Sequence, residues 1–186
     1  MYCKTVAVAL AALLGAIAYA QDAQPQSRAR GRSMSDQQFL TKAAEGGKAE
    51  VQMGQLASQN GSNSCVKQFG ERMVADHSKA NDQAKAVAAQ KGIILPASMN
   101  SKDESLYRSL SAKTGAEFDK AYMAAMINDH REDIAEFRQE ANSGNDPDIK
   151  SWAAKTLPVL EEHLRSAESC GKQVGVTTAP TGGDLR

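Results

Sequence analysis

The chain contains three histidines, and each of them falls on the apolar stripe of a segment with helical periodicity: His77, His130 and His163. In a fourth such segment a carboxylate, Glu50, takes a position where an apolar residue is expected. Neutral imidazole is a ligand for Zn, Cu, Fe and Ni, and carboxylates complete many such sites. A shared site of these four residues would therefore bind a transition-metal ion, with Zn, Fe, Cu and Mn as candidates.

Four acidic residues lie close to the candidate ligands in the sequence and could orient them or join them: Asp76, Asp129, Asp133 and Glu162. The alternative is a buried polar network, in which the histidines and Glu50 satisfy one another and confer helix register without a metal. Methionines also occur on the stripes, and we interpret them as core residues rather than soft-metal ligands.

Apolar periodicity predicts four long helices, over residues 35–58, 64–91, 116–141 and 147–170, and a short helix around 103–110. Ser35 or Asp36 suits the N-cap of the first helix, and Asp146 followed by Pro147 is a strong start for the last. The stripe of the first helix is rich in Gly and Ala. This composition allows a neighbouring helix to approach closely.

A connection of about 22 residues joins the second and third long helices, and its length bears on the topology. A plain up-down-up-down arrangement needs only a short loop there, and it would separate Cys65 and Cys170 by helices about 35–40 Å long. A disulfide requires Cα atoms within about 7 Å. We therefore predict an all-α, ferritin-like four-helix bundle of two helical hairpins joined by a long crossover, with both cysteines at one end. The four candidate ligands would then lie about 11–21 Å from that end.

The first 20 residues have the features of a secretory signal peptide: Lys4, an apolar run from Val6 to Ile17, and a small-residue cleavage site at Ala18-Tyr19-Ala20. A retained anchor helix is the alternative, although the run is short for a membrane span. The predicted organisation is a signal peptide (1–20), a disordered leader (21–34), the helical bundle (35–172) and a flexible tail (173–186).

Export also determines how the cysteines are interpreted. Cleavage would remove Cys3 and leave Cys65 and Cys170, an even pair in an oxidising compartment, for which a disulfide is expected. Two free buried thiols are the alternative. The bridge would close a loop of about 105 residues and stabilise the fold by about 4–5 kcal/mol.

The charge balance and the absence of other motifs narrow the functional classes. With 22 basic and 22 acidic residues the formal charge is zero, so nothing indicates a nucleic-acid partner. After signal cleavage we expect no transmembrane segment. No nucleophile–base pair, phosphate loop or nucleotide fingerprint is apparent. A protein or envelope partner is not identified by these patterns.

Several spaced motifs together resemble the exported bacterial proteins of the domain of unknown function 4142. The resemblance covers about residues 36–172 and is carried by Ala44-Glu-Gly-Gly47 with Glu50, Met73-Val-Ala-Asp-His77, Met126-Ile-Asn-Asp-His130, and Leu157-Pro158 with His163-Leu164. It implies a ferritin-like four-helix fold and a periplasmic or outer-membrane-associated location, and it brings no established activity.

The sequence departs from the di-iron proteins of the wider ferritin-like class, which use two Glu-x-x-His pairs. The residues three before the histidines are Val74, Ile127 and Leu160, so the standard dinuclear carboxylate site cannot be built. We expect an exported, non-enzymatic protein with a buried His/Glu metal site and a role in metal handling or envelope stress. The alternatives are a ferritin-like metal-dependent redox enzyme and a structural or interaction module with a polar core.

Overall fold

The structure, a computed structural model, describes residues 34–177. This range contains five α-helices and no strand, which confirms the predicted all-α class. The helices are α1 (Asp36–Asn60), α2 (Ser64–Gln90), α3 (Ser101–Ser111), α4 (Gly115–Ser143) and α5 (Pro147–Gln173). Their ends lie within about three residues of the predicted ones. The predicted signal peptide (1–20), all of the leader (21–34) except Met34, and the tail beyond residue 177 lie outside the described residues.

Local sequence signals explain where α1 and α5 begin. Ser35 Oγ accepts a hydrogen bond from the backbone N–H of Gln38 at 3.2 Å, and Gln38 Oε1 accepts one from the backbone N–H of Ser35 at 3.0 Å. This reciprocal pair is a capping box. Asp146 caps α5 by accepting from the N–H groups of the second and third helical residues, and Pro147 takes the first position.

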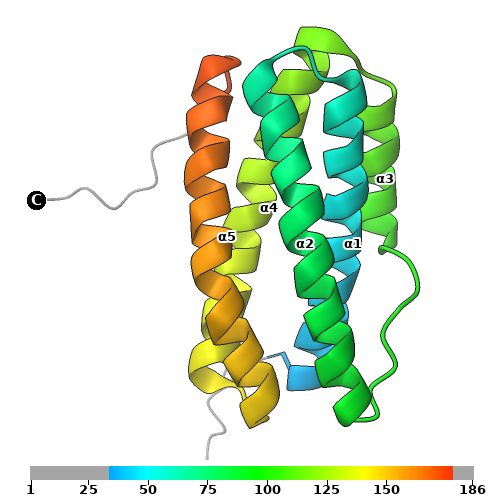
Figure 1. Cartoon of the computed structure of the whole chain (residues 1–186), viewed down its shortest axis with the longest axis vertical. Coiled ribbons are helices and arrows are strands. Elements are labelled where there is room, and N and C mark those ends of the chain that lie inside the picture. Colours follow the sequence, from blue (N-terminus) through cyan, green and yellow to red (C-terminus); the bar gives the residue numbers. More distant parts are fainter. Residues whose placement is uncertain (1–33, 178–186) are drawn as a thin grey trace, which may run out of the picture. The chain divides into compact units, whose positions relative to one another are not determined.

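The long helices pack as two hairpins, α1 with α2 and α4 with α5 (Figure 1). Contacts between α1 and α4 and between α2 and α5 join the two hairpins, and the short helix α3 lies against α1 and α4. Among residues 34–177, none of the helices combines the length and the apolar composition of a membrane span.

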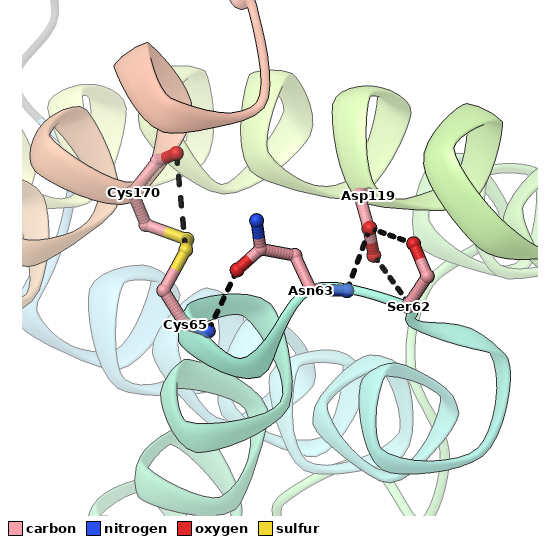
Figure 2. Close-up of a disulfide and its surroundings, with 5 residues drawn as sticks. All are labelled: Ser62, Asn63, Cys65, Asp119 and Cys170. Carbon is pink, nitrogen blue, oxygen red and sulfur yellow. Dashed lines mark hydrogen bonds between the residues drawn. A yellow bond between two sulfur atoms is a disulfide. The ribbon is translucent and has the colours of Figure 1, made fainter.

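The connection between α2 and α4, which includes α3, returns the chain to the end of the helices where α2 began (Figure 1). Asp119, near the start of α4, accepts hydrogen bonds from the backbone N–H groups of Ser62 at 3.0 Å and Asn63 at 2.9 Å, in the turn before α2 (Figure 2). The starts of α2 and α4 therefore lie at the same end, and the two helices run in the same direction.

Cys65 and Cys170 form a disulfide, as predicted, with their Cα atoms 5.8 Å apart (Figure 2). The bond joins the start of α2 to the end of α5. Because the two cysteines are 105 positions apart in sequence, the closed loop contains nearly all of α2 and α5 and the whole of α3 and α4, and it leaves α1 outside.

Two glycines allow α1 and α2 to approach closely, as the Gly- and Ala-rich stripe of α1 predicted. A Cβ atom at Gly54 would lie 2.7 Å from the carbonyl oxygen of Gly70, and one at Gly70 would lie 2.5 Å from Cβ of Ala57. Glycine costs about 1 kcal/mol in a helix relative to alanine. Here the close packing of the backbones offsets that cost.

The apolar core has two parts. One lies toward the disulfide and includes Met53, Phe69, Met73, Tyr122, Met123 and Met126. The other lies toward the opposite end and includes Phe39, Leu40, Ile134, Phe137, Trp152 and Leu160. The methionines are thus core residues, as predicted. Along α2, α4 and α5 each histidine falls between the residues of one part and those of the other, so the polar residues form a layer between two apolar regions.

Candidate metal centre

Each long helix contributes one of the four predicted ligands to this polar layer. Glu50 comes from α1, His77 from α2, His130 from α4 and His163 from α5. All four are buried, with exposed fractions of 5% for His77 and 0–1% for the others. The structure therefore brings together all four residues that the sequence singled out.

The three imidazole rings are mutual neighbours. Their centroids are 5.8 Å apart for His77 and His130, and 5.3 Å apart for His77 and His163 and for His130 and His163. One ring nitrogen of each histidine lies within 4.8 Å of the other two. This spacing is compatible with three nitrogen atoms around one ion at bond lengths of about 2.0–2.1 Å.

Hydrogen-bond partners assign the tautomers of two of the rings. His130 Nδ1 lies 2.9 Å from the backbone carbonyl oxygen of Met126, so this nitrogen carries the proton. His163 Nε2 lies 2.8 Å from Asp76 Oδ2 and donates its proton to that carboxylate. The remaining nitrogens, His130 Nε2 and His163 Nδ1, then face each other at 3.3 Å with two lone pairs and no proton between them.

The third ring, that of His77, lies beside a carboxylate but has no hydrogen bond. His77 Nδ1 lies 2.7 Å from Glu50 Oε2, within ion-pairing distance but without the alignment of a hydrogen bond. Its other nitrogen, Nε2, is buried and has no partner. In His130 and His163, one nitrogen donates to an oxygen atom and the other is left with a free lone pair. A metal-bound histidine has the same arrangement.

Burial keeps the imidazoles neutral. It lowers the pKa of His77 and of His163 to about 4 and that of His130 to about 3. The hydrogen bond to Asp76 opposes this effect at His163, and the other two histidines add to it at His130. Neutral imidazole is the form that binds metal, so the rings are ready to coordinate an ion at neutral pH.

A second cluster of three carboxylates adjoins the histidines. Glu50, Asp129 and Asp133 each present an oxygen within 4.8 Å of the other two. Glu50 links this cluster to the histidines, since its Oε1 lies 3.4 Å from His130 Nε2 and its Oε2 lies 2.7 Å from His77 Nδ1. Burial raises the pKa of Glu50 and of Asp133 and raises that of Asp129 to about 6, and the neighbouring acids add to the effect. From the sequence, both aspartates were predicted to lie near the histidines, but their grouping with Glu50 in a carboxylate cluster was not predicted.

Asp76 and Glu162, the other two acidic residues predicted to lie near the ligands, are on the outer side of His163. Asp76 is half-buried and lies between His163 and Arg72, whose Nε is 3.3 Å from the carboxylate. Burial opposes ionisation of Asp76, but the bonds from His163 and Arg72 outweigh it and lower its pKa. The Glu162 carboxylate forms no hydrogen bond or ion pair with a histidine of the described residues and pairs with Arg72 at 3.0 Å. Arg72 was not among the predicted residues, although its position four residues before Asp76 on one helix was a usable signal.

Asp76 also forms part of the wall of a groove of about 500 Å³ between α2 and α5. Val87, Trp152, Thr156 and Val159 contribute to the rest of the lining. Because Asp76 touches both the groove and His163, it connects the buried rings to solvent.

The fold and this centre define an all-α protein whose buried layer of imidazoles and carboxylates interrupts an otherwise apolar interior. The model of the family described as Domain of unknown function (DUF4142) matches residues 21–170. The match covers most of the chain, so the chain belongs to this family, as the resemblance predicted. No curated protein and no solved structure matches this chain.

Proposed function

We propose that this chain is an exported metal-binding protein that holds one transition-metal ion through His77, His130 and His163. The observation that carries the proposal is the orientation of the rings. His130 and His163 each donate from one nitrogen, to Met126 O and to Asp76, and turn the other nitrogen toward the partner ring, while His77 places Nδ1 beside Glu50. With the tautomers set by Met126 O and Asp76, His130 Nε2 and His163 Nδ1 face each other at 3.3 Å as two acceptors, whereas a purely structural network would be expected to place a proton between them.

Glu50 has two roles in this proposal. Its Oε2 orients His77, and its Oε1, 3.4 Å from His130 Nε2, is available as a fourth ligand. Three imidazoles and an oxygen donor suit Zn, Fe, Cu or Mn, with Zn and Cu favoured by the number of nitrogen ligands. Asp76 then acts as the carboxylate that orients a ligating histidine.

The proposed fold is a ferritin-like four-helix bundle over residues 35–172, made of two hairpins and one long crossover. The pairing of α1 with α2 and of α4 with α5 supports it, as does the common direction of α2 and α4. The proposed location is the periplasm or the outside of the cell, with association to the outer membrane as a further expectation. A disulfide between Cys65 and Cys170 supports an oxidising compartment.

Metal handling or envelope stress is the proposed role, without turnover. Val74, Ile127 and Leu160 stand where a di-iron protein would supply the glutamates of its Glu-x-x-His pairs. The histidines are also nearly inaccessible, since none exceeds 5% exposure, which leaves little room for a substrate at the ion.

Metal analysis of the full chain, purified from its natural compartment without chelators, tests this proposal. About one equivalent of metal per chain is expected, and adding the same ion to metal-free protein at 100 times its Kd should raise Tm by about 10 °C. His163→Gln should abolish both the bound metal and the rise in Tm. Asn128 is exposed and lies near the site on α4, so Asn128→Ala should retain both.

Two results would overturn the proposal. Absence of metal together with a higher Tm when Glu50 and the histidines are replaced by apolar residues would favour the structural module. Consumption of oxygen or peroxide by the iron-, manganese- or copper-loaded protein would favour the redox enzyme.

A further inference from the structure

The carboxylates beside the histidines have no neutralising partner. Within residues 34–177, neither Asp129 nor Asp133 takes part in an ion pair or a side-chain hydrogen bond. The lysines whose charges act on them, Lys102 and Lys42, make their ion pairs with Glu132 and Glu136 instead. Two half-buried acids on one face of α4 therefore stand close together without a base.

Glu50 reaches the same point from a different helix. Its exposed fraction is 1%, and both of its carboxylate oxygens are buried without a hydrogen-bond partner. A buried carboxylate without a hydrogen bond is costly because it loses hydration, and one close to two other carboxylates is costlier still. A bound cation would remove both penalties at once.

The donor atoms match one class of ion. Three carboxylate oxygens within 4.8 Å of one another fit around a divalent ion with oxygen bonds of about 2.1–2.5 Å. A site made only of oxygen atoms favours Mn²⁺, Mg²⁺ or Ca²⁺, whereas the adjoining imidazoles favour Zn²⁺ or Cu²⁺. Asp129 and Asp133 are half-buried rather than sealed, so part of each residue is exposed to solvent.

We propose that Glu50, Asp129 and Asp133 form a second cation site, selective for an ion that prefers oxygen ligands, and that Glu50 is shared between this site and the three histidines. The centre is then a two-ion centre with unlike halves: three imidazoles on one side, carboxylates on the other and Glu50 between them. The inference shares Glu50 with the proposed function, but the carboxylate site can be filled whether or not the imidazoles bind an ion.

Two probe ions separate the halves. In the first titration, Mn²⁺ is added to the full chain with its disulfide intact, and binding is measured by calorimetry and by the electron paramagnetic resonance of free Mn²⁺. In a separate titration, Co²⁺ is added and nitrogen ligation is measured by visible absorption. We expect one Mn²⁺ ion to bind per chain in the first titration and one Co²⁺ ion to bind per chain in the second. Asp133→Asn should weaken Mn²⁺ binding about 10-fold or more and leave the Co²⁺ spectrum in place. His163→Gln should do the reverse.

Glu140→Gln is the matched control, because Glu140 is also a buried acid of α4 with an unpartnered oxygen, but outside the centre. It should leave both ions bound. Asp→Asn changes remove like charge, so the metal-free variants should keep the helical circular dichroism and melt at or above the wild-type temperature. Asp129→Asn serves as the second variant if Asp133→Asn does not fold.

The outcomes distinguish the two proposals. Mn²⁺ affinity that is unchanged in both aspartate variants, or that is lost in His163→Gln as completely as Co²⁺ affinity, overturns the second site. Co²⁺ binding without Mn²⁺ binding overturns the second site and leaves the proposed function standing. Mn²⁺ binding without Co²⁺ binding overturns the proposed function and leaves the second site standing. If neither ion binds, both proposals are overturned.

Discussion

Asp76 Oδ2 lies 2.8 Å from Nε2 of His163, on the opposite side of the ring from the nitrogen that faces His130. This contact sets the tautomer of His163, and it also links a nearly inaccessible ring to a half-exposed carboxylate in the groove between α2 and α5.

Asp76→Asn should weaken metal binding without abolishing it. The amide can still take part in a hydrogen bond with His163, but it loses the negative charge that makes the imidazole a stronger donor to the ion. Loss of such an orienting carboxylate typically costs about 10–100-fold in affinity. Competition titration with a chromophoric chelator measures the change. Asp82→Asn, an exposed aspartate further along α2, is the control, and equal affinities in the two variants would contradict the role of Asp76.

The metal-free protein should become less stable in acid because of its histidines. Burial lowers the pKa of His77 and His163 to about 4, against about 6.5 in an unfolded chain. Between these values the unfolded chain binds protons that the folded chain does not, so the free energy of unfolding falls as pH drops from about 6.5 toward 4. The loss is on the order of 3 kcal/mol for each histidine. Urea unfolding at several pH values in chelator measures it, and His163→Gln should flatten the profile.

Asp129 should act in the opposite direction. Burial, with the charge of Asp103, raises its pKa to about 6, so near pH 5 the folded chain holds a proton that the unfolded chain has released. Its contribution to stability is present in acid and is lost as pH rises through 6. Asp129→Asn removes this opposing effect, and the acid loss caused by the histidines should become steeper. A flatter profile in this variant would mean that the sign assigned to Asp129 is wrong.

Two glycines of α1 should respond to alanine in opposite ways. Gly54→Ala places a Cβ atom 2.7 Å from the backbone of α2, so the hairpin must open and the protein should lose about 1–3 kcal/mol. Nothing lies within 4 Å of a Cβ atom at Gly46, and Gly46→Ala should stabilise the protein by about 0.5–1 kcal/mol. Thermal unfolding of the two variants side by side measures the difference, and equal shifts would refute close packing at Gly54.

The disulfide should contribute strongly to stability. Replacing Cys65 and Cys170 by serine should lower the free energy of unfolding by about 4 kcal/mol, because the bond closes a loop of more than 100 residues. Denaturant unfolding of the variant and of the wild-type protein, oxidised and reduced, measures the loss. The reduced wild type should behave like the double variant, and reduction of the double variant itself should have no effect.

Much of this protein follows from local pattern. Apolar periodicity and the end signals at Ser35, Asp146 and Pro147 located the helices, because helix formation depends on side chains three and four positions apart. The same periodicity identified Glu50 and the three histidines as inward-facing, since a polar residue on an apolar stripe stands out without any knowledge of its partners. The cysteine pair added the one long-range constraint that favoured a crossover.

The pairing of side chains was decided only by the tertiary structure. Which nitrogen of His163 is free depends on Asp76, 87 positions away, and the separation of Asp129 and Asp133 into a carboxylate cluster depends on the approach of α1 to α4. Spacing along a helix gives the face on which a residue lies and its position along the helix axis. Side-chain contacts between helices depend in addition on how far apart the helices lie and how each is rotated about its axis. Those quantities arise from packing at residues such as Gly54 and Gly70 and are set by all four long helices together.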